Sequence, residues 1–438
     1  MNNNNNNNNK GKYIFYFFIF LIFLELGLQT FWLHSLNNYL RPIIYFGLAI
    51  AYLTAGYYFS ILDNQANLIN FKIRFNKPIF NFLSLAVIFY LMYFIWSEFI
   101  YLVELHKIDP LNSDVIPSVE LYVKRFVTGE KVYTPLHFPG WDVAPTYLTL
   151  MWFPYVIPEI FGLDYRIFSL ILFFIFILIY SIYLLKKQSN NIAIYILAIL
   201  ALGILYLLVI KDNLIFVRTL ELTIAVFYMV LALTILNKKA WIISLGILLC
   251  LLSRYSLSFW LISYVLVLLV YRNWKFFFSV NFYVFIGVFI LFIPFIAHDL
   301  NIFVEGLKYY SKAAIGEWKV HSWQAKGEDP FQLSQGFGFA IYFYKFLPGE
   351  VVEKLKTLQR THLIISFISG ISIVIIYYFK RTKIKSVKLF LMFGLKFFLM
   401  VFFVFIQVPY SYLFIVPLFL IIPLLGQLIN DNKLQIVI

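Results

Sequence analysis

Residues 166–185 read RIFSLILFFIFILIYSIYLL, with one charged side chain, Arg166, at the start of the run. A helix of about 20 apolar residues is long enough to cross the hydrocarbon core of a bilayer. Similar runs lie at 13–33, 43–61, 80–103, 191–210, 214–236, 276–297, 361–379, 389–407 and 410–429. Only 13% of the residues are charged, against about 25% in soluble domains. The sequence therefore predicts an all-α polytopic integral membrane protein.

Residues 240–271 form a longer apolar stretch that is interrupted by the polar sequence SRYS at 253–256. Two short or tilted spans joined at this break fit the stretch better than one very long helix. With them we predict about 12 transmembrane helices in a single transmembrane domain, residues 13–438. The asparagine-rich tract before it buries no apolar surface, so residues 1–12 are expected to be disordered.

The basic residues predict which side of the membrane each connection faces. An N-terminus in the cytoplasm places most basic connections there, and it places the C-terminus there too. The basic residues of these segments are Lys10, Lys12, Lys72, Arg74, Lys77, Lys186, Lys187, Lys238, Lys239, Arg272, Lys275, Lys380, Arg381, Lys383, Lys385, Lys388 and Lys433. The net charge of +14 then reflects anchoring beside anionic membrane lipids rather than a nucleic-acid surface.

Two loops on the opposite, non-cytoplasmic face are long enough to fold, at about 105–165 and 298–360. In the first, apolar residues recur at helical spacing from Ile116 to Phe126, and Gly129 stands where such a helix should end. This pattern predicts a short amphipathic helix on the membrane surface. The segment 146–162 contains two prolines and a glutamate, which favours a re-entrant or interfacial segment.

The second loop mixes aromatic and cationic side chains, which suit sugar or lipid headgroups and equally suit an interfacial belt. These residues are Tyr309, Tyr310, Trp318 and Trp323 with Lys308, Lys312, His321 and Lys326.

The first loop carries the most informative short sequences in the chain. They are DVIP at 114–117, LY at 121–122, GEKVYTP at 129–135, PTY at 145–147 and DYR at 164–166. This pattern resembles the first external loop of GT-C fold glycosyltransferases, most closely the family 87 mannosyltransferase type. The resemblance covers about residues 80–185. Enzymes of this type usually place the acidic residue after the first span, whereas Asp114 follows the third predicted span.

The resemblance implies an inverting glycosyltransferase of glycan biosynthesis. It would transfer a hexosyl or pentosyl group from a polyprenyl-phosphate donor to a lipid, glycan or protein acceptor. Such a reaction needs a base for the acceptor hydroxyl and a positive group for the departing phosphate. By the resemblance Asp114 is the catalytic base. An aspartate directly before a helix also serves as an N-cap, and the two roles can coexist.

The remaining candidate residues each have a structural alternative. Arg254, in the polar break, binds the donor phosphate or reaches water from a hairpin tip. Arg218 contacts the donor phosphate or pairs with Glu221, three residues later. Asp142 and Glu120 are secondary acid candidates. Asp142 is alternatively a solvated loop residue, and Glu120 alternatively pairs with Lys124.

Asp164 and Arg166 are expected to form a local ion pair where the chain re-enters the membrane. His298 and Asp299 could hold a metal ion or the acceptor, although such a pair at a span end more often caps a helix. No His, Cys and carboxylate cluster has the spacing of a metal site, so we assign no metal ligand and leave open a divalent cation. The alternative function is a transporter or flippase for lipid-linked glycans, although no internal repeat is evident.

Overall fold

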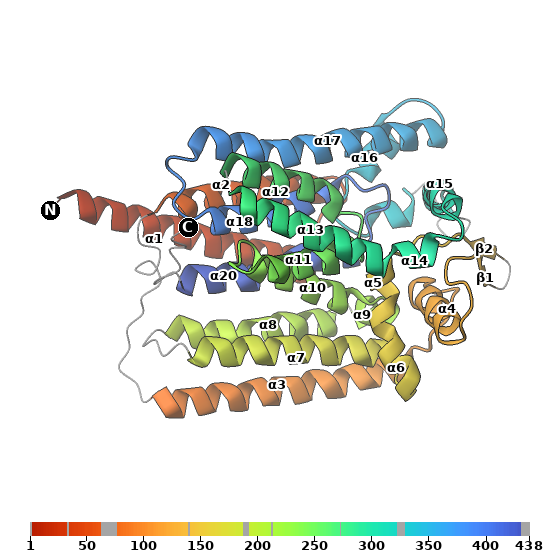
Figure 1. Ribbon diagram of the computed structural model, residues 1–438, viewed down its shortest axis with the longest axis horizontal. Coiled ribbons are helices and arrows are strands. Elements are labelled where there is room, and N and C mark those ends of the chain that lie inside the picture. The colour runs from red at the N-terminus through yellow and green to blue at the C-terminus, as the bar shows by residue number, and fades with distance from the viewer. Residues whose placement is uncertain are drawn as a thin grey trace.

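The computed structural model describes residues 2–32, 35–62, 77–138, 141–186, 192–211, 213–271, 273–321 and 329–430. In this part of the chain the regular structure is helical except for one two-stranded hairpin. The long helices run side by side along the longest axis of the molecule (Figure 1). The protein is therefore an all-α, multi-pass integral membrane protein.

The N-terminal half contains the hairpin and ten helices or helical turns. These elements are α1 (Asn2–Gly27), η1 (Leu28–Trp32), α2 (Leu40–Ile61), α3 (Lys77–Leu105), α4 (Val115–Val127), β1 (Leu136–Phe138), β2 (Trp141–Val143), α5 (Thr149–Trp152), η3 (Phe153–Tyr155), α6 (Val156–Phe161), α7 (Tyr165–Lys186) and α8 (Ile192–Lys211). The strands pair antiparallel, with His137 opposite Asp142.

The regular elements of the C-terminal half are all helical in the described residues. Its elements are α9 (Asn213–Arg218), α10 (Glu221–Thr234), α11 (Ala240–Leu251), α12 (Leu257–Tyr271), α13 (Trp274–Leu291), α14 (Ile293–Ile296), α15 (Asn301–Glu317), η5 (Phe331–Ser334), α16 (Ala340–Phe346), α17 (Val351–Lys380), α18 (Val387–Val404), η6 (Ser411–Phe414), α19 (Ile415–Phe419) and α20 (Ile421–Asn430).

Nine described segments are long and apolar enough to cross a membrane. They are 11–31, 40–61, 77–105, 165–186, 192–211, 274–296, 351–380, 387–404 and 411–429. The apolar helices α10, α11 and α12 have 14, 12 and 15 residues, which is shorter than a full crossing. The predicted segments are thus helical, whereas the number of twelve crossings stays a prediction.

The polar break predicted inside residues 240–271 is present. α11 ends at Leu251 and α12 begins at Leu257, so SRYS at 253–256 lies between two separate helices. The predicted span at 214–236 is also divided, because α9 ends at Arg218 and α10 begins at Glu221. Both interruptions place charged side chains at helix ends, where water and polar partners are closer than at a helix centre.

The connections gather at the two ends of the bundle. Figure 1 shows α4, the hairpin β1–β2, α6 and α15 together at one end, and the connection between α17 and α18 at the other. The latter connection carries Arg381, Lys383 and Lys385, which are among the basic residues expected in the cytoplasm. Five of the other basic residues expected in the cytoplasm lie outside the described residues: Lys72, Arg74, Lys187, Arg272 and Lys433. The same holds for two residues of the second loop, Trp323 and Lys326.

Two segment boundaries differ from the expectation. α1 begins at Asn2, so the structure continues the first helix through the tract for which the composition predicts disorder. Extending a helix that already exists avoids the unfavourable nucleation step, which makes such a continuation less demanding than an isolated polar helix. α17 begins at Val351, so its first turns occupy the end of the second predicted loop.

The centre of the bundle is formed by α18 and residues 411–429. In each of these two spans, 89% of the residues in the apolar 18-residue segment are buried. α2 packs closely on α18, since an added Cβ at Gly56 would overlap the side chain of Phe393. Small residues permit such close helix contacts in membranes. By contrast, only 22% of the residues in the corresponding segment of α3 are buried. Its exposed Phe89, Tyr90 and Tyr93 are suited to contact lipid.

One ion pair lies inside this apolar core. Glu25 of α1 and Lys396 of α18 are both 0% exposed, with a Lys396 Nζ to Glu25 Oε2 distance of 2.8 Å. Tyr52 Oη of α2 donates a hydrogen bond to Glu25 Oε2 at 2.6 Å, and Lys396 Nζ donates to the carbonyl of Pro417 at 2.6 Å. A charge in hydrocarbon is unfavourable unless it is paired. The pair therefore connects α1 and α2 to α18 and α19.

We expect Glu25→Leu to lower the free energy of unfolding by about 3–5 kcal/mol, because it leaves Lys396 buried without its counter-charge. The double variant Glu25→Leu/Lys396→Met should recover most of that loss, since it removes both charges. Thermal unfolding of the purified protein in detergent measures both. The control is Glu104→Leu, at an exposed position of α3. A Glu25→Leu variant that unfolds at the same temperature as the control contradicts the prediction.

Candidate functional site

The amphipathic helix predicted in the first loop is α4. Its apolar face is buried at Ile116, Val119 and Val123, and the helix ends before Gly129, which has a φ of 76° that an L side chain rarely adopts. Glu120 and Lys124 lie one turn apart, with 4.0 Å between their charged atoms, as expected. The helix is thus anchored by its buried apolar face.

Asp114 precedes α4 but does not cap it. Its backbone carbonyl accepts a hydrogen bond from Ser118 at 2.9 Å, whereas its side chain makes no capping hydrogen bond. The N-cap alternative for this side chain is therefore wrong. The carboxylate is accessible to solvent, yet the surrounding protein raises its pKa through burial, and a hydrogen bond to its own backbone partly opposes this. A raised pKa brings a carboxyl group closer to the range useful for a base at neutral pH.

The residues around Asp114 come from segments far apart in the sequence. Burial raises the pKa of Tyr147, Tyr309, Tyr310 and Tyr410, and the negative charge of Asp114 raises each of them further. The charge of Asp114, in the first loop, therefore acts on residues of α15 and on the residue before the last span. We call these four tyrosines with Asp114, Arg254 and Glu317 the Asp114 cluster.

Glu317, at the end of α15, is the acidic member that sequence reasoning missed. Burial raises its pKa, His321 lowers it, the charge of Asp114 raises it, and a hydrogen bond with Tyr410 lowers it. The charge of Asp114 thus acts on a carboxyl group 203 positions away in the chain. The sequence offered no signal for this pairing, because α15 has no motif that relates it to the first loop.

Arg254 brings the positive charge to the cluster. It forms an ion pair with Glu221, whose side chain is 1% exposed, while the side chain of Arg254 remains 20% exposed. Its charge lowers the pKa of Tyr147 and Tyr310 against the larger raising effect of burial, so these tyrosines respond to both Arg254 and Asp114. Glu221 therefore pairs with Arg254. The expected alternative, an ion pair between Arg218 and Glu221, is wrong.

Three contacts hold the pieces of the cluster in place. Tyr255 Oη donates a hydrogen bond to the carbonyl of Thr146 at 2.6 Å, and the amide of Leu150 donates to the carbonyl of Leu252 at 2.7 Å. Tyr309 Oη donates to the carbonyl of Asp142 at 2.6 Å. The polar break between α11 and α12 and the helix α15 are thus both fixed against the first loop.

Tyr147 is itself positioned by two other tyrosines. Tyr133 Oη donates a hydrogen bond to the carbonyl of Tyr147 at 2.9 Å, and the amide of Tyr147 donates to Tyr122 Oη at 3.4 Å. Tyr122, Tyr133 and Tyr147 all belong to the short sequences that distinguish the first loop. Their role in the structure is to fix the path of the loop beside Asp114.

The two secondary acid candidates lie in other surroundings. Asp142 contacts His137 at 2.8 Å, and its side chain is 69% exposed. This agrees with the alternative in which Asp142 is a solvated loop residue. Burial raises the pKa of Glu120, and the charges that act on it are those of Lys124, Glu159, Asp164 and Arg166. Glu120 therefore faces the α6–α7 side rather than the Asp114 cluster.

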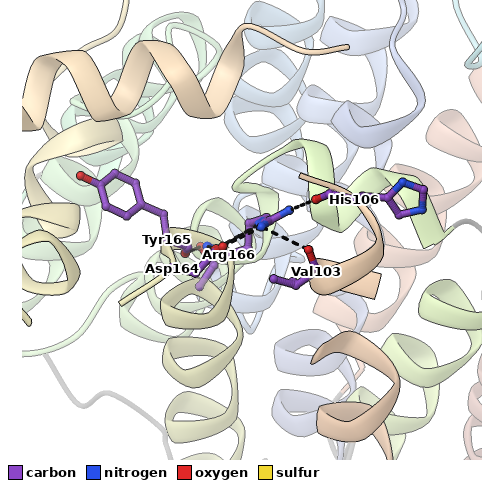
Figure 2. Close-up of polar contacts among 6 residues, drawn as sticks. Val103, His106, Asp164, Tyr165 and Arg166 are labelled. Atoms are coloured by element: carbon purple, nitrogen blue, oxygen red, sulfur yellow. Dashed lines mark hydrogen bonds and ion pairs between the residues drawn. The ribbon is translucent and has the colours of Figure 1, made fainter. Parts of the chain in front are cut away.

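The expected ion pair of Asp164 and Arg166 is present, with Arg166 Nη2 to Asp164 Oδ2 at 2.6 Å. Figure 2 shows that the same guanidinium also reaches the end of α3. Arg166 Nη1 donates to the carbonyl of His106 at 2.6 Å, and Nη2 lies 3.5 Å from the carbonyl of Val103. A cation at the last carbonyls of a helix stabilises its C-terminus. Arg166 thereby fixes the point from which the chain leads to Asp114.

Arg218 is the last residue of α9. It lines a pocket of about 300 Å³ between the end of α3, the residues before α4 and the end of α9. Its backbone carbonyl accepts a hydrogen bond from Ser113 Oγ at 3.0 Å. The expectation that Arg218 contacts the donor phosphate stays a prediction.

The described residues hold no group of three or more His, Cys, Asp or Glu side chains that could bind a metal ion. Asp299 accepts a local hydrogen bond from the amide of Asn301 at 3.0 Å, whereas the N-cap residue of α15 is Leu300 and no described side chain caps this helix. The divalent cation that the sequence leaves open stays a prediction.

Comparisons of the chain with protein-family models, with curated proteins and with solved structures find no match.

Because the Asp114 side chain caps nothing, Asp114→Asn and Asp114→Ala should both fold normally. The folded pKa of Asp114 is raised by burial, so the folded protein holds this proton more tightly than the unfolded chain. The ionised carboxylate thus disfavours folding above its folded pKa. At pH 7 both variants should unfold at the wild-type temperature or slightly above it, and the difference should disappear in acid, where Asp114 is protonated in both states.

The control is Asp109→Ala, because the Asp109 carboxylate accepts hydrogen bonds from the amide of Leu111 at 3.0 Å and from Asn112 Nδ2 at 3.1 Å. It should lose about 1 kcal/mol. Thermal unfolding at both pH values provides the measurement. A similar loss in Asp114→Ala but not in Asp114→Asn would reinstate the capping role.

Proposed function

We propose that this protein is an integral-membrane glycosyltransferase. It would transfer a sugar from a polyprenyl-phosphate donor to a lipid, glycan or protein acceptor at the non-cytoplasmic face. The observation that supports this proposal most is Asp114, an accessible carboxylate with a raised pKa whose side chain makes no capping hydrogen bond. It lies in a cluster of tyrosines, and Arg254 lowers the pKa of two of them, Tyr147 and Tyr310, against the larger raising effect of burial. A carboxylate that stabilises no helix and pairs with no described cation is available for chemistry.

In the proposed reaction Asp114 accepts the proton of the acceptor hydroxyl as its oxygen attacks the anomeric carbon of the donor sugar. The bond from that carbon to the phosphate oxygen breaks, and its electron pair leaves with the polyprenyl phosphate. Single displacement of this kind inverts the anomeric configuration. Arg254 would stabilise the negative charge that develops on the departing phosphate, because a guanidinium donates several charge-assisted hydrogen bonds in one plane.

Glu221 has a supporting role in this proposal. Its buried carboxylate pairs with Arg254 and leaves 20% of the arginine side chain exposed toward a ligand. An arginine fixed by a buried partner loses less conformational freedom when it binds a phosphate. Glu221 is thus a positioning residue for Arg254.

The tyrosines and Glu317 suit the recognition of a sugar. Tyrosine offers an aromatic face and a hydroxyl group that donates or accepts a hydrogen bond. Asp114 raises and Arg254 lowers the pKa of Tyr147 and Tyr310. A sugar placed between the base Asp114 and a phosphate at Arg254 would therefore lie beside these tyrosines. Glu317 would accept hydrogen bonds from sugar hydroxyls.

A transporter or flippase for lipid-linked glycans is the second candidate, and the buried pair of Glu25 and Lys396 is the observation that favours it. Intramembrane charges often mark transport paths. Here both side chains are 0% exposed and bonded to their neighbours, which equally fits a structural pair. Translocation of a labelled lipid-linked sugar in proteoliposomes, without chemical change, would select the transporter function.

The central test is Asp114→Asn, which preserves the size of the side chain but cannot accept a proton. Loss of a positioned general base commonly lowers a rate by about 100- to 10,000-fold. The assay is sugar transfer by purified protein in liposomes, with a panel of polyprenyl-phosphate sugars. The wild-type rate should also fall as the pH decreases through the raised pKa of Asp114, because only the ionised base accepts a proton.

The matched control is Glu120→Gln, which removes a carboxylate from the same helix segment without touching the Asp114 cluster, and it should stay within about threefold of the wild-type rate. Near-normal turnover in Asp114→Asn would refute its role as the base.

For the donor phosphate the informative variant is Arg254→Lys. It keeps a positive charge for Glu221, so the fold should survive, but it loses the planar group that binds two phosphate oxygens. We expect kcat/KM for the donor to fall about tenfold or more. The control is Arg360→Lys, at an exposed position of α17. Equal donor kinetics in the two variants would leave Arg254 with its ion pair alone.

A further inference from the structure

The pocket that contains Arg218 is lined in part by the segment that carries Asp114. Its lining includes Leu105, His106, Lys107, Ser113, Pro117 and Arg218, and its volume of about 300 Å³ is at the lower end for ligand sites. Ser113 and Pro117 flank Asp114 in sequence, whereas Asp114 itself does not line the pocket. The pocket is thus adjacent to the Asp114 cluster and distinct from it.

Arg218 makes this pocket chemically specific. Among the described residues its guanidinium makes no hydrogen bond and no ion pair, although the side chain is half-buried. The backbone of Arg218 is connected to the segment before α4 by a hydrogen bond from Ser113 Oγ to the Arg218 carbonyl at 3.0 Å. A half-buried guanidinium with five donors is complementary to a phosphate or carboxylate.

Besides Arg218 the lining carries one further cation, Lys107, one carboxylate, Asp109, and the imidazole of His106. Lys107 is exposed at the rim and His106 is half-buried. Asp109 contributes the one carboxylate of the lining, but both of its oxygens accept hydrogen bonds, from the amide of Leu111 at 3.0 Å and from Asn112 Nδ2 at 3.1 Å. A ligand would therefore meet Arg218 and Lys107 as available cations.

The position of the pocket indicates that its ligand is amphipathic. It lies at the end of α3, which forms one edge of the bundle in Figure 1. The last turns of α3 expose Tyr101 (61%) and Leu105 (59%), and Leu105 also lines the pocket. A spanning helix with an exposed apolar side is a surface for lipid chains, and its end marks the level of the headgroups.

We propose that this pocket binds the phosphate headgroup of a lipid, with Arg218 and Lys107 as its ligands and the lipid chain along α3. The shared chemistry is a phosphate group on a long apolar chain, which a polyprenyl phosphate and an anionic bilayer phospholipid both provide. The site does not depend on the transfer chemistry proposed for Asp114, since it requires only binding.

The test measures binding of fluorescent polyprenyl phosphate and fluorescent phosphatidylglycerol to the purified full-length protein in detergent. We expect Arg218→Gln to weaken binding by about tenfold or more, because it removes a charge-assisted hydrogen-bonding partner. Lys107→Gln, at an exposed position where folding is not at risk, should weaken it about threefold and reduce its sensitivity to salt. Lys312→Gln removes one exposed positive charge from α15 and should leave binding unchanged.

The outcomes separate the sources of the phosphate. Loss of polyprenyl phosphate binding alone assigns the pocket to that lipid, and equal loss for both lipids assigns it to lipid phosphates in general. Competition by inorganic phosphate as strong as by either lipid would overturn the lipid assignment. Unchanged binding of both lipids in Arg218→Gln and Lys107→Gln would overturn the proposal. Asp114→Asn should keep lipid binding, so failure of the transfer proposal and failure of this one are distinguishable.

Discussion

The structure depends on the need to satisfy every backbone polar group inside hydrocarbon. Helices meet this requirement within one segment, which is why the apolar runs of the chain are helical wherever they are described. The same constraint moves polar side chains to the ends of the bundle. At one end this brings α4, the hairpin β1–β2 and α15 together (Figure 1). The Asp114 cluster is a consequence of that sorting, since polar segments from the two long loops have only the two ends of the bundle to occupy.

Most charged groups away from water have a specific partner. Glu25 pairs with Lys396, Glu221 with Arg254, and Asp164 with Arg166, and each pair connects or positions helices. Against this background two groups differ. Asp114 neither caps α4 nor forms an ion pair with a described residue, and Arg218 lines a pocket without a described partner. Charged groups that stabilise nothing in their own fold are the strongest indications of a ligand, and they motivate the two proposals.

A small number of hydrogen bonds assembles the cluster. Tyr255 and Tyr309 each donate to a carbonyl of the first loop, and the amide of Leu150 donates to the carbonyl of Leu252 in the polar break. The first loop is thus the common partner of the break and of α15. Shifts in any of these contacts would move Arg254 or Glu317 relative to Asp114. The geometry of the site is therefore carried by loop tyrosines as much as by the spanning helices.

The sequence by itself determined the class of the protein, the positions of the apolar helices, the break at 253–256, the amphipathic helix α4 and the ion pair of Asp164 and Arg166. These are local properties, because hydropathy, helical period and short-range charge spacing are read within a few turns. Only the tertiary structure decided that Glu221 pairs with Arg254, that Arg218 lies in another pocket, that Glu317 joins Asp114, and that Glu25 meets Lys396. Glu221 and Arg254 are 33 positions apart in the chain, and Glu25 and Lys396 are 371 positions apart. The packing of helices brings such residues together, and no local pattern in one sequence records which helix faces meet.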